Sequence, residues 1–424
     1  MSVREKLACS REEMESWCHE KAMDIYGGEV PEELSARLTS ELDVIFEKDC
    51  VPQFMVAKFV ADKAKADGRL IGFRGTEGCS LVAFLLGITD INPIENRLPG
   101  CVLYGPDYRY MPRFMLNLPN YYRKEMIAAL REEYGLGNVH MIAKERPENK
   151  DEFGFVGDVL ILDEEMRNND MIGVMVSGEA CLHPVFWKMY GSKYVVAQIR
   201  LLEHDGITMI DRLEKTVGKV STDDITESQK WDTVFSLLSG VTALENTGEY
   251  KLKNAYKQAS GVTGIPECEN LEMREILSEI RAHSFRDLME AFYNMRGVHP
   301  KSHALEYALM MSKLLYYKLY HPLEFYAANY TACVWEYNSG FYSFDTERLN
   351  ARIEELDRDS HVDFRLRKLM KNYNVVLEMR LRGINFAEPD ESKMDDKCFN
   401  VVDNKIMPSK RFMDGQDGLP FNFA

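Results

Sequence analysis

One glycine-containing segment constrains the fold of this chain more than any other. Residues Gly72–Ser80 follow a short apolar run at 70–71 and precede a second apolar run at 81–86. Glycines adopt backbone conformations that other residues avoid, and a chain entering a helix presents unpaired N–H groups that suit an anion. The segment therefore predicts a strand-to-helix turn able to hold a phosphate. The residues expected around that phosphate are Arg74, Gly75, Gly78 and Ser80.

A plain strand-to-helix turn is the structural alternative for this segment, because a short glycine-rich loop alone is a weak signal. Glu77 lies within the segment, and its carboxylate would repel a phosphate. The residues by themselves therefore leave both interpretations open.

The composition describes a globular chain of 424 residues that is long enough for two or three domains and a large core. No stretch of eighteen residues lacks charge and the N-terminus does not resemble a signal peptide, so a cytoplasmic protein without a membrane partner is expected. The nine cysteines are scattered singly, which is typical of reduced thiols and speaks against zinc. The net charge of 52 − 68 = −16 would repel nucleic acid at long range, although a local basic groove remains compatible with binding.

The spacing of apolar residues predicts a mixed α+β fold. Helices are expected over most of residues 1–65, including an amphipathic helix with Leu34, Leu38 and Leu42 on one face. Residues 68–211 alternate short apolar runs with helical segments, and the pattern from 212 onward is mainly helical. The expected strands lie at 114–118, 156–162, 171–176, 194–202 and 207–210.

Four stretches, in this order along the chain, resemble the PolC-type replicative DNA polymerase of bacteria, the α subunit of DNA polymerase III. They lie at 20–31, 72–93, 300–328 and 377–386. The second stretch joins the glycine segment to Gly87–Pro93, and the third joins Pro300–Ala304 to His321–Ala328, so both are long and specific. The resemblance covers nearly the whole chain.

The resemblance implies an organisation in four parts. A helical lead-in would precede a nucleotidyltransferase-like palm, truncated helical fingers and a small C-terminal region. It also implies a shortened core that lacks the N-terminal nuclease parts of such polymerases and much of their fingers sequence. The expected boundaries are 1–50, 51–215, 216–345 and 346–424.

The chemistry of the family that the chain resembles is phosphoryl transfer by two magnesium ions, which need about three converging carboxylates. The resemblance implies that Arg113 and Met115 replace the first two aspartates, and that Asp211 is the remaining third acid. A guanidinium and a thioether cannot hold magnesium, so we expect no resident metal and no cofactor. Arg113 would instead pair with Asp211.

Alternatives to this interpretation involve other carboxylates. The missing pair of aspartates could instead be aligned with Asp107 as its first member, but Arg109 would then stand at the second position. The alignment that places the pair at 113 and 115 is preferred, because it reaches Asn138 without a gap. Asp158 or Asp163 would join Asp211 if the catalytic site had moved, and magnesium would then be required. Asp211 is otherwise an ordinary satisfied aspartate.

The resemblance also implies that Lys301 and His303 face nucleotide phosphates, against the alternative of an exposed lysine and a packed histidine at a helix start. A cationic helix at 364–382 suits the DNA backbone or an acidic partner, although a solvated helix face is the more common outcome. Its candidate DNA-binding residues are Arg365, Arg367, Lys368 and Lys371.

The C-terminal segment is similar to the loose Gln-x-x-Leu-x-Phe pattern of bacterial sliding-clamp ligands. The residues that fit this pattern are Gln416, Leu419 and Phe421. The same region also resembles an ordinary turn that follows the fingers, and six loosely defined positions match often by chance. A sliding clamp or another replisome protein is therefore an expected partner beside nucleotide or DNA.

Together, these features predict a catalytically degenerate polymerase homologue that binds nucleotide, DNA or replisome components, in a phage or another mobile element. An active DNA-directed DNA polymerase with relocated carboxylates is the first alternative. A regulatory module that acts only through protein contacts is the second, and the charge of −16 favours it.

Overall fold

The computed structural model describes residues 1–100, 114–146, 149–163, 173–176, 179–183, 194–238, 260–295, 301–334, 344–358 and 364–413. They form two compact units, and each is described by itself. The first unit comprises Met1–His204 with Pro300–Glu306, and the second comprises Asp205–His299 with Tyr307–Leu419. The boundary at 204 lies near the expected end of the palm-like region at 215, and the division into four domains stays a prediction.

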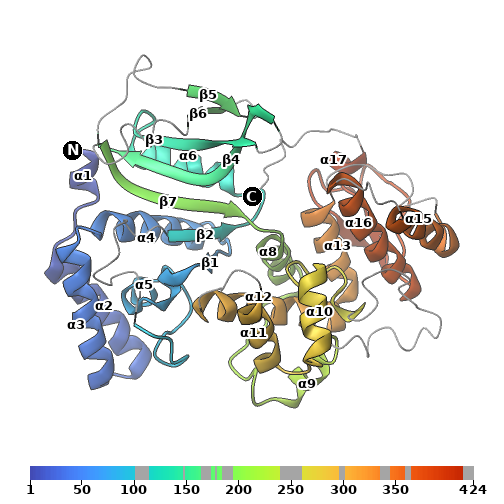
Figure 1. The fold of residues 1–424 in the computed structure, drawn as a ribbon, viewed down its shortest axis with the longest axis horizontal. Coiled ribbons are helices and arrows are strands. Elements are labelled where there is room, and N and C mark those ends of the chain that lie inside the picture. The colour runs from blue at the N-terminus through green and yellow to red at the C-terminus, as the bar shows by residue number, and fades with distance from the viewer. Residues whose placement is uncertain are drawn as a thin grey trace. The chain divides into compact units, whose positions relative to one another are not determined.

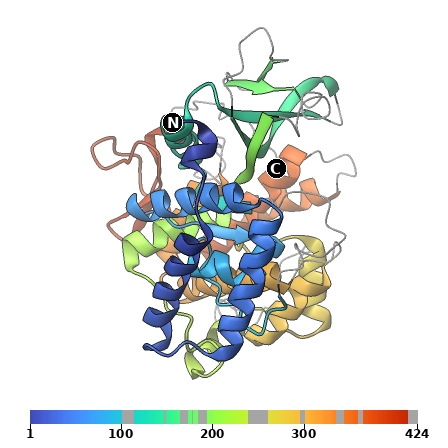
Figure 2. The same cartoon turned by 90° about the vertical axis from the view of Figure 1, so that its left-hand side faces the viewer.

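The first two helices of the first unit are capped at their starts by serine side chains. The Ser10 hydroxyl accepts a hydrogen bond from the Glu13 N–H at 3.2 Å, and the Glu13 carboxylate accepts one from the Ser10 N–H at 2.9 Å. The predicted stripe of Leu34, Leu38 and Leu42 is buried in the core. Figure 2 shows these helices in blue, facing the viewer. They are α1 (Val3–Lys6), α2 (Arg11–Tyr26), α3 (Glu32–Glu47) and α4 (Val51–Ala66).

A seven-stranded mixed sheet forms the centre of the first unit, in the order β1-β2-β7-β4-β3-β6-β5. The pairs β2–β7 and β3–β6 are parallel, and the remaining pairs are antiparallel. Helices α4 and α6 (Arg123–Tyr134) pack against β7 and its neighbours, as Figure 1 shows. The strands are β1 (Gly72–Arg74), β2 (Phe114–Leu118), β3 (Val139–Arg146), β4 (Asn149–Leu162), β5 (Gly173–Val176), β6 (Glu179–Leu182) and β7 (Val195–Glu203).

The mixed α+β class predicted from the sequence is confirmed. The expected strands at 114–118, 156–162 and 194–202 lie within or across β2, β4 and β7. The strand expected at 207–210 is wrong, because these residues belong to helix α8 (Asp205–Val217). A short run in which three of four residues are apolar does not separate a strand from a buried helix, and the buried Ile207, Ile210 and Leu213 recur at helical spacing.

The second unit is mainly helical, as predicted from 212 onward. Helix α8 packs against α13, and α15 packs against α16. A two-stranded antiparallel hairpin of β8 (Asn400–Val402) and β9 (Lys405–Met407) completes the described part of this unit. Its helices are α8, α9 (Gln229–Phe235), α10 (Leu271–Glu279), α11 (Phe285–Asn294), most of α12 (Lys301–Tyr320), α13 (Pro322–Cys333), α15 (Thr346–Arg358), α16 (Phe364–Leu381) and α17 (Lys410–Met413).

A fully buried ion pair joins the helices of the second unit. The Lys318 ammonium on α12 lies 2.8 Å from the Glu378 carboxylate on α16, and both side chains have no exposed surface. The Lys318 Nζ also donates to the backbone oxygens of Gly261 and Thr263, and the Tyr326 hydroxyl donates to Glu378. Burial lowers the pKa of Lys318 to about 8, against the opposing effect of Glu378. These contacts pair the buried Lys318 ammonium with Glu378 Oε1, whereas Glu378 Oε2 is buried without a hydrogen-bond partner among the described residues.

No helix in the described ranges is both long and apolar enough to cross a membrane.

Candidate functional site

The glycine segment forms the predicted strand-to-helix turn in the first unit. Strand β1 ends at Arg74, a 3₁₀ turn spans Thr76–Cys79, and α5 (Leu81–Leu85) follows. Gly75 has φ of 116° and ψ of −169°, a conformation that side chains disfavour. A Cβ atom there would lie 2.6 Å from Glu77 Oε2 and 2.8 Å from Met115 Cε. The turn therefore requires glycine at this position.

Glu41 on α3 accepts hydrogen bonds from the N–H groups at the end of this turn. Its carboxylate accepts hydrogen bonds from the Ser80 hydroxyl at 2.8 Å, the Leu81 N–H at 3.1 Å and the Val82 N–H at 3.2 Å. Ser80 also caps α5, since its Oγ accepts from the Ala83 N–H at 3.1 Å. An internal carboxylate thus holds the groups that sequence reasoning assigned to phosphate, and a phosphate bound by Ser80 would have to displace Glu41.

Arg37 holds Glu41 in this position. Its Nε donates to the Glu41 carboxylate at 3.1 Å, and its guanidinium also donates to the backbone oxygens of Leu98, Cys79 and Pro99. The two side chains lie one helical turn apart on α3, a spacing that favours an ion pair. Sequence reasoning missed Glu41, and the Arg37–Glu41 spacing alone would not have shown that the glycine segment folds onto it.

The start of α12 lies beside the turn. The Ser302 hydroxyl donates to the Gly75 carbonyl oxygen at 2.8 Å, and the Phe73 N–H donates to Glu306 at 3.2 Å. Gly78 permits this approach, because a Cβ there would lie 3.1 Å from the Ser302 Cβ. Two predicted phosphate ligands, Arg74 and Lys301, therefore flank one contact.

The side chains of the predicted ligands differ in exposure. Arg74 is half-buried and Lys301 is exposed, and neither makes a side-chain hydrogen bond or ion pair with the residues that the structure describes. His303 is only 4% exposed, as the packing alternative expects. The two cations are available to an anion, whereas His303 would reach one only after a rearrangement.

Four residues form a row across β1, β2, β7 and β4. Arg74 is the register partner of Met115, Met115 is that of Arg200, and Arg200 is that of Asp158. Register partners project from the same face of a sheet. The row therefore places two guanidinium groups, one thioether and one carboxylate side by side.

The single carboxylate of this row is already neutralised. Arg200 Nη2 lies 2.5 Å from Asp158 Oδ2, and Arg200 Nε lies 3.2 Å from both carboxylate oxygens. Gln198 donates a further hydrogen bond to Asp158 at 2.9 Å. Arg200 was missed in the sequence, where nothing marks it as a neighbour of Met115.

Asp211, the predicted remaining acid, lies on α8 in the second unit. It is 2% exposed, and its carboxylate lies 2.7 Å from Lys215 Nζ. It therefore projects from a helix, not from a strand of the sheet. Its predicted partner Arg113 lies outside the described residues. Asp163, one of the alternative acids, pairs with Arg4 at 2.8 Å.

Among the described residues, no group of three or more histidine, cysteine, aspartate or glutamate side chains is arranged to hold a metal ion. The row offers Asp158 alone, and a magnesium site of the two-metal kind needs several converging oxygens.

The predicted DNA-binding residues lie on α16, which packs against α15 and α13. Arg367 is exposed, Lys368 and Lys371 are half-buried, and the placement of the Arg365 side chain lies outside the description. The clamp-like residues Gln416, Leu419 and Phe421 lie outside the described residues. These two assignments stay predictions.

The first unit is thus an α+β unit in which a glycine turn joins a strand at the edge of a mixed sheet to a short helix. Comparison with known proteins shows which family the chain is similar to. The sequence pattern of the family described as bacterial DNA polymerase III alpha NTPase domain matches residues 12–162. The chain is a distant relative of the PolC-type α subunit of DNA polymerase III, over 91% of its length in one such comparison. The resemblance found in the sequence is thereby confirmed.

Three relatives illustrate how low the sequence identity is. The PolC-type DNA polymerase III of Thermotoga maritima is 22% identical over 552 residues, which cover 91% of this chain and 39% of that protein. The enzyme of Thermotoga petrophila is 21% identical with the same coverage. That of Latilactobacillus sakei is 36% identical over 89 residues, or 21% of this chain and 6% of the relative. The chain thus spans well under half the length of the curated relatives that it matches.

Proposed function

We propose that this chain is a catalytically inactive homologue of the PolC-type α subunit, with a nucleotidyltransferase-like palm and helical fingers, which binds nucleotide phosphate or DNA without extending a primer. The row of Arg74, Met115, Arg200 and Asp158 carries this proposal. Like charges repel, so two guanidinium groups oppose the entry of a divalent cation, and Arg200 already neutralises the single carboxylate. Without a metal pair, the attacking hydroxyl and the leaving pyrophosphate lack their stabilising charges.

Anion binding is supported by Arg74, which also belongs to the row, and by Lys301. Arg74 and Lys301 flank the contact between Gly75 and Ser302, and no described residue engages their charges. Guanidinium and ammonium groups bind phosphate oxygens through charge-assisted hydrogen bonds. A phosphate is therefore expected near Arg74 and Lys301, at the Gly75 end of the turn. At the other end, Glu41 already accepts the N–H groups of Leu81 and Val82. The cations of α16 would add contacts to a DNA backbone.

Primer extension tests the inactive assignment. The purified chain should not extend a primed template with magnesium or manganese present. Metal-dependent synthesis that is lost in Asp158→Asn or Asp211→Ala would overturn the assignment and favour the alternative of an active polymerase with relocated carboxylates. The assay needs a PolC-type enzyme as positive control, because a negative result alone is informative only beside an active enzyme.

Nucleotide binding tests the phosphate site separately. A fluorescent deoxynucleoside triphosphate should bind, and Arg74→Gln/Lys301→Gln should weaken its binding about tenfold or more, because two charge-assisted contacts are lost. Lys65→Gln/Lys124→Gln removes the same charge from exposed positions of the first unit and should leave binding nearly unchanged. Equal affinities in both double variants would contradict this site.

Binding to replisome proteins is the remaining part of the proposal. It rests on the clamp-like pattern of Gln416, Leu419 and Phe421 and on the similarity to PolC-type DNA polymerase III. A pull-down with purified sliding clamp, with and without residues 416–421, tests it. Retention that does not depend on these residues would exclude the motif.

A further inference from the structure

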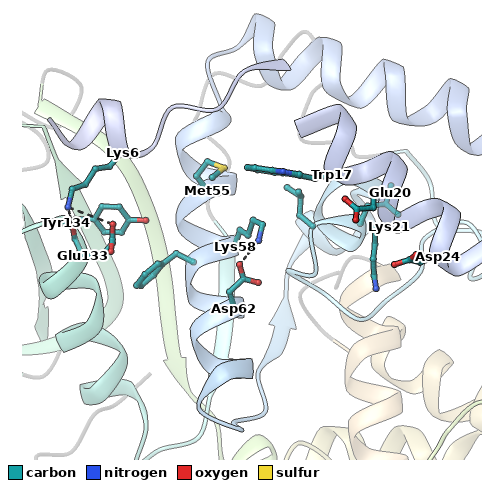
Figure 3. A pocket seen from close by; sticks show the side chains of 13 residues that line it. Lys6, Trp17, Glu20, Lys21, Asp24, Met55, Lys58, Asp62, Glu133 and Tyr134 are labelled. Carbon is teal, nitrogen blue, oxygen red and sulfur yellow. Dashed lines mark hydrogen bonds and ion pairs between the residues drawn. The ribbon is translucent and has the colours of Figure 1, made fainter. Parts of the chain in front are cut away.

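A groove in the first unit is separate from the glycine turn and from the sheet row. It has a volume of about 540 Å³ and is formed by α2 and α4, with contributions from α1, the end of α5 and α6. Figure 3 shows Lys6, Glu133 and Tyr134 at one end, Met55, Trp17 and Lys58 in the middle, and α2 residues at the other end. We call it the Trp17 groove. It is lined by Lys6, Trp17, Glu20, Lys21, Asp24, Met55, Lys58, Phe59, Asp62, Leu85, Leu86, Glu133 and Tyr134.

A partly exposed aromatic side chain and several apolar side chains line this groove together. Trp17 is 38% exposed, although large aromatic side chains are usually well covered in a folded chain. Leu85 and Tyr134 are buried beneath the groove, and Phe59 contacts Tyr134 edge to face with ring centroids 5.6 Å apart. The groove therefore offers an apolar surface on which a small side chain of a partner would be desolvated.

The charges of the groove divide into paired and available groups. Lys58 lies 2.5 Å from Asp62, and Lys6 lies 3.8 Å from Glu133. Glu20 and Asp24, one turn apart on the exposed side of α2, make no side-chain hydrogen bond or ion pair with any residue in the described ranges.

Lys21 is the opposing available charge at this end of the groove, and it too has no described partner. This end of the groove thus has two available carboxylates and one available ammonium, and the whole chain carries a charge of −16. Both features favour a cationic partner over an acidic one.

We propose that the Trp17 groove binds a short segment of a partner protein that presents an arginine next to an aliphatic or aromatic side chain. The apolar side chain packs on Trp17, Met55 and Phe59. The guanidinium meets Glu20 and Asp24, whose carboxylates suit its paired donors. Lys58 Nζ already lies over the face of the Trp17 ring, 5.9 Å from its centroid.

Peptide binding to the full chain tests this proposal. The probes are a fluorescein-labelled peptide of alternating arginine and leucine and a matched peptide of alternating glutamate and leucine, followed by fluorescence anisotropy. The arginine peptide should bind more tightly. Glu20→Gln/Asp24→Asn should weaken its binding about five- to tenfold and flatten its salt dependence, and Trp17→Ala should weaken it about tenfold.

A matched control distinguishes binding by the groove carboxylates from a general effect of the net charge of the chain. Glu12→Gln/Glu29→Gln removes two carboxylates from exposed positions outside the groove, and this variant should bind like the unmodified chain. Trp17 is 38% exposed and thus more than half covered, so the circular dichroism spectrum and thermal midpoint of Trp17→Ala are compared with those of the unmodified chain before its binding is interpreted.

Three results would overturn the proposal. They are tighter binding of the glutamate peptide, equal losses in the groove and control double variants, and no binding of either peptide at about millimolar concentration. The Arg74→Gln/Lys301→Gln variant should keep full peptide binding, so this test is independent of the phosphate site.

Discussion

Replacing Glu41 by glutamine tests whether an internal carboxylate holds the glycine turn. In the structure, Glu41 Oε1 accepts from the Leu81 N–H and Arg37 Nε, and Oε2 accepts from the Ser80 hydroxyl and the Val82 N–H. Glutamine has the same shape, but it keeps only one of the two acceptor oxygens. One pair of donors then faces an amide NH₂ group in the protein interior.

The expected cost follows from those contacts. A buried donor that loses its acceptor costs about 1–3 kcal/mol. Two donors are affected, and the Ser80 hydroxyl is able to rotate toward another acceptor. Arg37 keeps its backbone partners at Leu98 and Pro99, so its own desolvation adds little. We therefore expect Glu41→Gln to destabilise the turn by about 2–4 kcal/mol.

Hydrogen exchange with mass spectrometry suits this measurement, since a chain with two compact units need not unfold in one step. Peptides that cover 72–90 should show the loss of protection. Glu47→Gln on the same helix changes an exposed carboxylate and should stay within about 0.5 kcal/mol of the unmodified chain. Equal protection of 72–90 in the two variants would refute the role of Glu41.

Three further predictions concern buried charge, backbone conformation and pH. Lys318→Met should destabilise the second unit by about 3–5 kcal/mol in urea, because it leaves Glu378 buried without its partner, whereas Lys318→Met/Glu378→Leu should cost clearly less. Gly75→Ala should cost about 1–3 kcal/mol by the same hydrogen-exchange measurement, and Gly100→Ala, with open space at the Cβ position, should be nearly silent. Burial raises the pKa of the Cys18 thiol to about 12. The unfolded thiol releases its proton first as pH rises above about 9, so stability should fall between about pH 9 and 12, and less steeply in Cys18→Ala. Equal stability of the two Lys318 variants, equal costs at the two glycines, or equal pH slopes would contradict these expectations.

Local patterns in the sequence were sufficient to predict much of the secondary structure of the first unit. The stripe of Leu34, Leu38 and Leu42 predicted a buried helix face, and the glycine turn was placed between a strand and a helix. These features depend on side-chain periodicity and on backbone restrictions within a few residues. The family relationship was recognised from stretches of the same local kind and is confirmed.

The error at 207–210 shows where local patterns fail. A four-residue run with three apolar side chains fits a buried strand and a buried helix equally well, and only the packing of α8 against α13 decides between them. Asp211 therefore projects from a helix, although its position after an apolar run suggested the end of a strand.

The candidate site depended most on tertiary structure. Arg74, Met115, Arg200 and Asp158 lie on four strands, and strand register alone places them in one row. A shift of one residue in any pairing would turn a side chain to the other face of the sheet. In the same way, Glu41 reaches the glycine turn only because α3 packs on α5. By itself the sequence determined which chemical groups are present and which local turns they form. Tertiary structure decided which charges meet, because charges interact through distances in space that sequence separation does not specify.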